Sequence, residues 1–262
     1  MAEPREYRPN SQPILPGKGA TDYERYLRTD ELLSLQKTPA EMLHRDELLF
    51  QTVHQSTELW LKLAAWEVEG AIECLRCSRL GEAIRMLQRA TDCVDLITHQ
   101  LHMMEHMSPW DYQSIRNGLG HGSGFGSPGF NRINELPPKL WDAFESLLKE
   151  HGLGVVELYR RGPEFAELYQ LAELLIKWDG RVTLWRLHHF KVVERTIGGD
   201  VVGTAGTPIE VLNRILHKRR FPALWDARTE LTGIARWTEG HSTSTPPVPA
   251  RGVHVDGGPG AG

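Results

Sequence analysis

The chain has 262 residues, a formal net charge of −4 and a sequence pI near 6.3. This weakly acidic balance offers no basic field for nucleic acid, and no stretch approaches the roughly 18 apolar residues of a membrane-spanning helix. The polar, proline-rich stretch from Met1 to Lys18 lacks the apolar core of a secretory signal. Three cysteines, an odd number, argue against a disulfide framework and favour a reducing cytoplasm.

Composition divides the chain into three parts. Residues 1–19 show little periodic hydrophobicity and are expected to be a flexible segment. Residues 241–262 are rich in Ser, Thr, Pro and Gly, a composition that predicts a disordered tail. The region between them, residues 20–240, is expected to form a single helical domain.

Apolar residues at spacings of three and four predict a series of helices in this central region. They run from Asp22 to Leu35, from Glu47 to Leu75 and from Leu80 to Met107, and then near residues 138–150, 164–178, 182–197 and 208–217. Thr21 or Asp22 is expected to cap the first helix, and Pro109 to end the third. Since no convincing pair of alternating strands is present, the predicted fold is an all-α bundle.

Two motifs within this pattern invite other readings. Cys74 and Cys77 form a Cys-x-x-Cys pair, but the pair lies inside a helical pattern rather than after a strand, and Ser78 stands where haem attachment would need histidine. They are expected to be ordinary helix cysteines. The glycine-rich stretches 118–129 and 198–206 lack the strand context and Gly-Lys-Ser/Thr ending of a phosphate loop. Loops of this kind are more naturally placed around a cofactor or substrate pocket.

Histidines are the residues most able to carry chemistry here. His99, His102 and His106 share one face of a predicted helix and could bind a metal, although a solvated polar face explains them equally well. His54 lies among apolar residues of the second predicted helix, where a satisfied core histidine is the simpler alternative. His188 and His189 are adjacent, so only one of them can face a given pocket. Buried histidines on two separate helices are compatible with a haem site.

Four sequence blocks, in order along residues 20–230, resemble the tryptophan 2,3-dioxygenase family. They are Asp46–Trp60, preceded by Tyr23–Leu33; Ser108–Arg116, followed by Gly122–Phe125; Leu184-Trp-Arg-Leu-His-His-Phe190, continuing through Gly198 to Gly203 and Thr204; and Arg220–Trp225. One such motif alone would be weak, whereas four in order are specific.

The resemblance implies an all-α bundle around a b-type haem that is ferrous in its active form, with dioxygen as co-substrate. His189 matches the family's iron ligand, while His188 occupies a position that the family does not reserve for histidine. His54 matches the distal catalytic histidine, which meets the indole N–H of the substrate. Ser123 and Gly124 match positions beside the cofactor. The implied reaction opens the indole C2–C3 bond of tryptophan to N-formylkynurenine.

The resemblance also implies how the substrate is held. Tyr112 and Arg116 match the residues that hold its carboxylate, and a planar guanidinium grips a carboxylate through two parallel hydrogen bonds. Phe50 matches an aromatic residue that lines the indole pocket, and Thr204 lies in the loop that closes over the amino-acid end. A terminal stripe matches a helix that reaches a neighbouring subunit's pocket in a homotetramer; it consists of Tyr23, Tyr26 and Leu27.

Departures from the family pattern fall on the substrate side. The region 129–178 looks shortened, Gly126 replaces a glutamine, and the closing loop at residues 198–209 is altered. These changes suggest a specialised member acting on an altered tryptophan, which could instead insert a single oxygen atom and give a hydroxylated or 2-oxindole product. A haem sensor or carrier, or an inactive homologue, are alternatives of other classes. The sensor does not predict a carboxylate clamp, so Tyr112 and Arg116 argue against it.

Overall fold

A computed structural model describes residues 12–199, 201, 203, 206, 216 and 218–240, with side chains up to residue 236. Every regular element within these residues is a helix, which confirms the predicted all-α class. The α-helices are α1 (Asp22–Leu27), α2 (Thr29–Leu32), α3 (Glu47–Arg76), α4 (Leu80–Gln100), α5 (Pro109–Gly118), α6 (Pro128–Glu150), α7 (Val155–Arg160), α8 (Ala166–Ile197) and α10 (Pro222–Gly240). Three 3-10 helices join them: η1 (Leu101–His106), η2 (Gly124–Gly126) and η3 (Gly162–Phe165).

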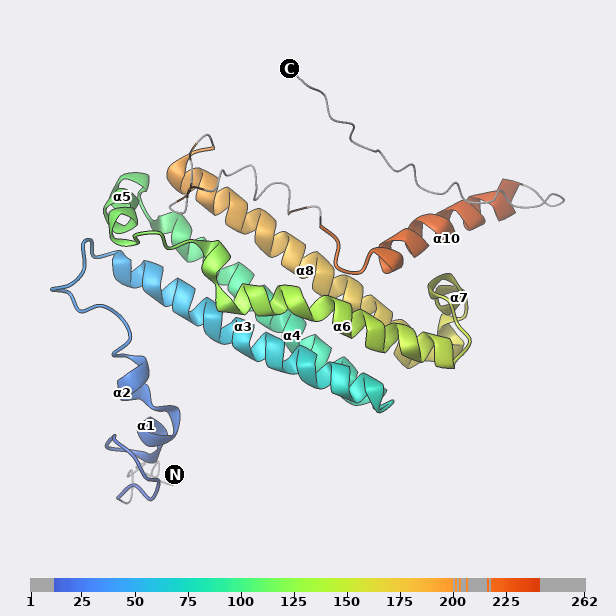
Figure 1. Cartoon of the computed structure of the whole chain (residues 1–262), viewed down its shortest axis with the longest axis horizontal. Helices are drawn as coiled ribbons and strands as arrows, with labels where there is room; N and C mark the ends of the chain where they lie inside the picture. The colour runs from blue at the N-terminus through green and yellow to red at the C-terminus, as the bar shows by residue number, and fades with distance from the viewer. Residues whose placement is uncertain are drawn as a thin grey trace, which may run out of the picture.

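Four long helices form the bundle. In Figure 1, α3, α4, α6 and α8 lie along one another, with α4 packed between α3 and α8 and with α6 against α3. Their facing sides form a large hydrophobic cluster with fully buried members such as Leu140, Phe144 and Trp178. No helix in the described part of the chain is long and apolar enough to cross a bilayer.

The N-terminal helices lie apart from the bundle (Figure 1). Thr21 caps α1 as predicted, because its hydroxyl accepts from the amide of Glu24 while the Glu24 carboxylate accepts from the amide of Thr21. The single helix predicted from Asp22 to Leu35 is wrong, however. Arg28 adopts left-handed backbone angles (φ 54°) and separates α1 from α2.

The helix predicted from Leu80 to Met107 is also shorter than expected. It ends at Gln100, whose side-chain amide donates to the carbonyl of Val53 (3.1 Å) and to the Thr57 hydroxyl. The chain then tightens into η1. Three buried side chains follow at a spacing of three, the period of a 3-10 helix; they are Leu101, Met104 and Met107.

Helix α6 begins ten residues before the predicted Pro138, and Pro137 and Pro138 lie inside it. Ser127 caps its start, with Pro128 at the first position. The Glu58 carboxylate of α3 accepts from the amide of Gly129 at 2.9 Å. A Cβ on Gly129 would lie 2.7 Å from Leu61 Cβ, so only glycine permits this close approach. Helix α5, which was not predicted, starts in the same way as α6, with Ser108 as cap and proline at its first position.

The helices predicted at 164–178 and 182–197 are one continuous helix, α8, which passes through Gly180 without a break. Helices α7 and α10 were not predicted, and the helix predicted at 208–217 lies outside the described residues except for Leu216. The buried Asp179 carboxylate fixes the start of α10, because it accepts from the Arg220 amide and from Trp225 Nε1, each at 2.9 Å. Cys74 and Cys77, at the end of α3, are free thiols.

Candidate active site

A second, smaller hydrophobic cluster lies at the end of the bundle where α3, η1, α5 and α8 meet (Figure 1). Its buried members are Val53, Leu101, Met104, Met107, Ile115 and Val192. Larger side chains pack onto it from three helices, among them Phe50 from α3, Tyr112 from α5 and Trp185 from α8. Residues far apart in sequence thus share one apolar wall at this end of the molecule.

His54 presents a defined nitrogen at this wall. Its Nδ1 lies 2.7 Å from the carbonyl oxygen of Phe50, and its ring stacks on the Phe50 ring with the centroids 4.0 Å apart. A carbonyl only accepts, so Nδ1 carries the hydrogen and Nε2 keeps its lone pair. Surrounding protein removes water and lowers the pKa of His54, although the ring keeps an exposed edge. The neutral imidazole therefore offers Nε2 as a hydrogen-bond acceptor.

His189 reaches the same region from α8. Its ring is stacked on that of Trp185, one helical turn earlier, with the centroids 4.9 Å apart and the planes 15° from parallel. Burial and, to a smaller extent, the imidazoles of His54 and His188 together lower the pKa of His189 to about 4. A neutral imidazole is the form that binds a metal.

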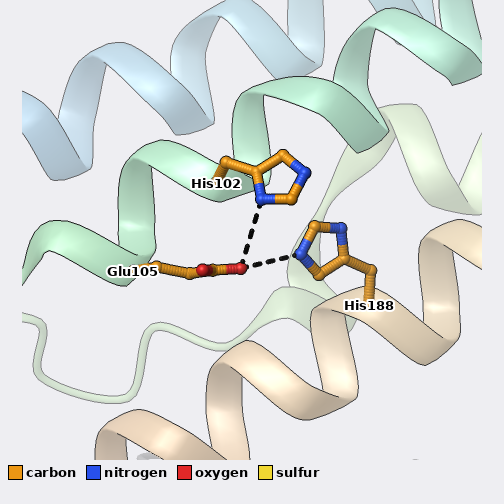
Figure 2. A group of neighbouring side chains, drawn as sticks. All are labelled: His102, Glu105 and His188. Carbon is orange, nitrogen blue, oxygen red and sulfur yellow. Dashed lines mark hydrogen bonds and ion pairs between the residues drawn. The ribbon is translucent and has the colours of Figure 1, made fainter.

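The neighbouring His188 is engaged elsewhere. Its Nε2 lies 3.1 Å from Oε1 of Glu105 in η1. Figure 2 draws this contact as a dashed line. Adjacent helix residues point about 100° apart, so His188 meets η1 while His189 faces the second cluster. This arrangement favours His189 over His188 as the metal ligand.

Trp185 carries a buried hydrogen-bond donor without a partner. Its Nε1 has no hydrogen-bond acceptor among the described residues. Leaving a buried donor unpaired costs about 1 to 3 kcal/mol, and in native proteins such a group usually marks a missing water, ion or ligand. A haem carries carboxylates that accept hydrogen bonds. A neutral His189 and an unpaired donor one helical turn away fit a bound haem.

Tyr112 and Arg116 bring polar groups to the same edge from α5. The Tyr112 ring lies 6.0 Å from that of Phe50, and burial raises the pKa of the phenol while the Arg116 charge opposes the rise. The guanidinium is therefore close to the phenol, as expected for residues one helical turn apart. Tyr112 thus brings a phenol beside Phe50, and Arg116 follows it by one helical turn; a phenol and a guanidinium are donors that suit a carboxylate.

Comparison with known proteins identifies the family. The sequence profile of tryptophan 2,3-dioxygenase matches residues 11–138. The tryptophan 2,3-dioxygenase of Caulobacter vibrioides is 34% identical over 260 residues, covering 80% of this chain and 98% of the relative. The enzymes of the same name from Bacillus thuringiensis subsp. konkukian and Myxococcus xanthus are 32% and 30% identical, covering 92% and 91% of their lengths. The chain belongs to the tryptophan 2,3-dioxygenase family.

This chain is a shortened member of the tryptophan 2,3-dioxygenase family. The alignment with the Caulobacter protein spans 260 residues but takes in only 80% of this chain. The relative therefore has residues that this chain lacks, in agreement with the shortening suggested by the sequence.

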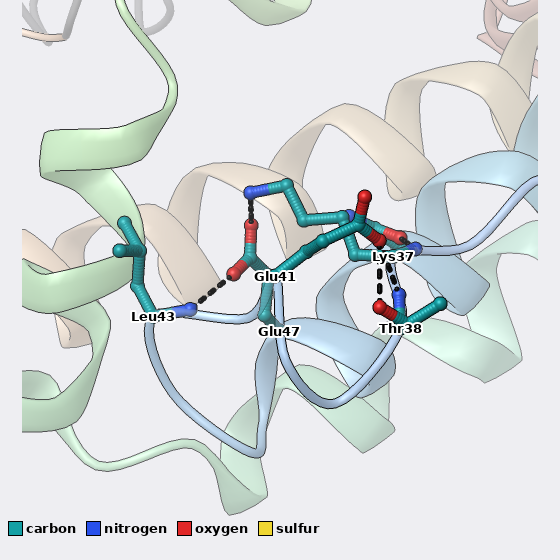
Figure 3. A network of polar contacts seen from close by, with 6 residues as sticks. Lys37, Thr38, Glu41, Leu43 and Glu47 are labelled. Atoms are coloured by element: carbon teal, nitrogen blue, oxygen red, sulfur yellow. Dashed lines mark hydrogen bonds and ion pairs between the residues drawn. The ribbon is translucent and has the colours of Figure 1, made fainter.

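The start of α3, which carries Phe50 and His54, is held by the polar network of Figure 3. Buried Glu47 forms an ion pair with Lys37 and accepts from the amide of Leu43 at 2.9 Å. Burial alone would raise the pKa of Glu47, but the ion pair and the amide outweigh it, and the pKa lies below its usual range. The loop before α3 is therefore fixed to the first turn of the helix that carries His54.

The remaining predicted site residues lie elsewhere. Ser123 caps η2, its hydroxyl accepting from the amide of Phe125, and a Cβ on Gly124 would meet no neighbour, so local packing does not require this glycine. The α1 residues Tyr23, Tyr26 and Leu27 are 69%, 77% and 46% exposed, far from the second cluster. Thr204 lies outside the described residues.

Two residues of this region had no role in the sequence-based prediction. Trp185 lay inside a recognised block, and its signal was the spacing of four before His189. Gln100 was a polar residue at the end of a predicted helix. Its side chain bonds to α3, for example by accepting from the Ser56 hydroxyl at 2.9 Å. These bonds depend on helix packing that the sequence does not display.

Proposed function

We propose that this chain is a haem-dependent oxygenase that uses dioxygen to oxidise the indole C2–C3 bond of L-tryptophan or a tryptophan derivative, giving an N-formylkynurenine-type product. The observation that carries the proposal is the apolar wall of the second cluster, where Phe50 contacts His54 and Tyr112 and where Trp185 stacks on His189, in a chain of the tryptophan 2,3-dioxygenase family. Haem b, when bound, supplies the iron that activates dioxygen.

On the haem side, His189 is the residue that would bind the haem iron. Its stack with Trp185 fixes the plane of the imidazole, and the unpaired Trp185 Nε1 is available to an acceptor on the bound group. Glu105 keeps His188 turned away. Ser123 and Gly124 are proposed to border the cofactor, where the open space at Gly124 leaves room for a ligand.

On the substrate side, the indole N–H and the carboxylate of the substrate each meet a residue of opposite hydrogen-bonding character. His54 Nε2 accepts from the indole N–H, because Nδ1 is committed to the Phe50 carbonyl. The Phe50 ring provides an apolar face for the indole. Arg116 binds the carboxylate with Tyr112 as a second donor. Thr204 is proposed to close over the amino-acid end.

The apolar residues of the second cluster keep water from this site. Met104, Met107 and Ile115 are at most 6% exposed and have no polar side-chain group to hold solvent. A dry site strengthens the hydrogen bonds and ionic contacts that orient the substrate. The free thiols of the three cysteines support a reducing compartment such as the cytoplasm.

The chain is proposed to act as a homotetramer in which α1 completes a neighbouring site. Its exposed apolar stripe of Tyr23, Tyr26 and Leu27 has the composition of a surface that is buried on association. Analytical ultracentrifugation checks this, with a tetramer expected for the wild type and a smaller species for Tyr26→Ser/Leu27→Ser. A fully active monomer would contradict it.

The decisive experiment is mass spectrometry of products from tryptophan and ring- or β-substituted tryptophans under isotopically labelled dioxygen. Two labelled oxygen atoms in a ring-opened product are expected. One labelled atom in a hydroxylated or 2-oxindole product would replace dioxygenation with monooxygenation. A protein that shows a haem Soret band but consumes none of these substrates would be a sensor or carrier, and the proposal would be withdrawn.

A further inference from the structure

A cluster of three metal-ligating side chains lies outside the proposed active site, between η1 and α8 (Figure 2). Oε1 of Glu105 is 3.1 Å from Nε2 of His188 and 3.3 Å from Nδ1 of His102. One ligand atom from each residue lies within 4.8 Å of the other two. The His102 and His188 rings meet edge to face at 4.6 Å between centroids.

Local geometry accounts for this convergence. Side chains three residues apart eclipse one another in a 3-10 helix, so His102 and Glu105 lie on the same face of η1. On α8, His188 points about 100° away from His189 and so faces η1. The turn itself is fixed at both ends, because Gln100 bonds to α3 and the Arg195 guanidinium donates to the Glu105 carbonyl at 3.3 Å.

The donor set suits a divalent transition metal. Two imidazole nitrogens and one carboxylate oxygen are ligands that Zn²⁺ binds at about 2.0 to 2.2 Å, which places neighbouring ligand atoms about 3 to 4 Å apart. Two of the three separations already lie in this range. The third, between the two imidazole nitrogens, is at most 4.8 Å, and the His102 side chain, which is 63% exposed, can turn to shorten it. Solvent reaches the cluster, so water can complete the coordination.

We propose that His102, Glu105 and His188 form a binding site for Zn²⁺ or a similar divalent transition-metal ion that joins η1 to α8. In the metal-bound form, bonds from the ion to Glu105 and to both histidines replace the direct contacts of Glu105 with the two imidazoles. It thereby ties the turn that carries Met104 and Met107 to the helix that carries His189. The sequence left open whether His99, His102 and His106 bind a metal or form a solvated polar face. Only His102 of these three joins the cluster, and the other two ligands are Glu105 of η1 and His188 of α8.

Zinc binding to the haem-loaded protein tests the site. Haem loading keeps His189 occupied, and competition with a chromophoric chelator measures affinity and stoichiometry. We expect one zinc ion per chain and a melting temperature that rises with zinc concentration, because an ion that binds only the folded state stabilises it. His102→Ala, which leaves α8 untouched, is expected to weaken binding at least about tenfold, and Glu105→Gln to do the same.

His106→Ala is the matched control, since His106 is an exposed histidine of the same 3-10 helix outside the cluster. It is expected to bind zinc as the wild type does. His188→Ala is expected to lose the zinc effect while keeping its haem spectrum. Absence of zinc binding by the wild type would overturn the proposal. So would equal affinities of the wild type and the His102→Ala/Glu105→Gln double variant, or an equal loss in His106→Ala.

Discussion

Helices α3 and α8 each pass through two different environments. Toward the end of α3 and the start of α8, their side chains join the large cluster, where residues such as Leu61 and Leu171 are at most 1% exposed. At their other ends they join the second cluster, where His54 keeps an exposed edge and Trp185 a buried donor without a partner. The same two helices thus supply rigidity at one end and ligand-binding groups at the other.

The difference between the large cluster and the second cluster indicates which end of the molecule can gain free energy by binding a ligand. A close-packed apolar end has little left to gain from a ligand, because its surface is already buried. The second cluster holds neutral imidazoles and an unsatisfied donor that a ligand can pair. Substitutions in the first region should therefore change the free energy of unfolding, and those in the second should change haem or substrate binding.

The largest expected effect is that of His189→Ala. Without the axial ligand, we expect loss of the ferric and ferrous haem spectra and of all oxygenase activity, while the circular dichroism spectrum stays helical. Absorption spectra of the purified variant, with haem quantified per chain, provide the measurement. His188→Ala is the adjacent control and should keep both haem and activity; the reverse outcome would assign the ligand to the wrong histidine.

Phe144→Ala probes the opposite end of the molecule. Phe144 is fully buried against Trp141 in the large cluster, and its removal should lower the free energy of unfolding by about 3 to 5 kcal/mol through lost burial and a residual cavity. Urea denaturation measures this. The half-exposed Leu96→Ala in α4 is the control and should change far less. Folded Phe144→Ala should bind haem normally. A loss of haem binding without unfolding would contradict the division of the molecule into a stabilising end and a ligand-binding end.

Arg116→Ala should weaken tryptophan turnover severely without changing haem content. A buried carboxylate that loses its charged partner costs about 3 to 5 kcal/mol, which corresponds to at least about a hundredfold loss in kcat/KM. An indole-3-alkyl compound without a carboxylate is the control substrate and should not distinguish Arg116→Ala from the wild type. Equal losses on both substrates would mean that the substitution disturbs the fold, and the clamp assignment would be wrong.

These contrasts also show what the sequence could predict. Helical periodicity located α3 to within one residue, because its apolar face is continuous from Leu48 to Leu75. It missed the start of α6, since Pro137 and Pro138 read as a boundary while the actual start depends on Ser127 and on Glu58 of another helix. Periodicity likewise did not show the left-handed backbone at Arg28, which separates α1 from α2. Nor did it show the bonds of Gln100 to α3, after which the chain forms a 3-10 turn.

The candidate site divides in the same way. The blocks resembling the family named His54, His189, Tyr112 and Arg116. In the structure Tyr112 packs on the second cluster, His54 stacks on Phe50, and His189 stacks on Trp185, while their roles and that of Arg116 stay predictions. The tautomer of His54 required the carbonyl of Phe50, which no sequence pattern reveals. The His102–Glu105–His188 cluster was missed because His188 lies 83 residues from Glu105 in the chain.

Trp185→Phe separates the stacking role of this residue from its hydrogen bond. The phenyl ring can keep the stack on His189, but the unpaired donor is gone. Haem-free protein should be as stable as the wild type or slightly more stable in urea, because an unsatisfied buried group has been removed. Haem should dissociate several-fold faster, measured by transfer to an excess of a haem-scavenging protein. Unchanged dissociation would show that Trp185 Nε1 does not contact the cofactor.

His54→Ala should have the smallest effect of the substitutions at the site. The lost interaction is a neutral hydrogen bond between Nε2 and the indole N–H, worth about 1 kcal/mol net, so kcat/KM for tryptophan should fall roughly fivefold. Arg116→Ala loses far more because its partner is a charge rather than a neutral dipole.

N1-methyltryptophan tests the assignment of the hydrogen bond directly. This substrate has no indole N–H to donate, so His54→Ala should reduce its turnover less than that of tryptophan. His54→Gln, which restores an acceptor at a similar reach, should recover part of the loss on tryptophan and none on the methylated substrate. If His54→Ala reduced both substrates equally, His54 would act on the indole through packing with Phe50 rather than through Nε2.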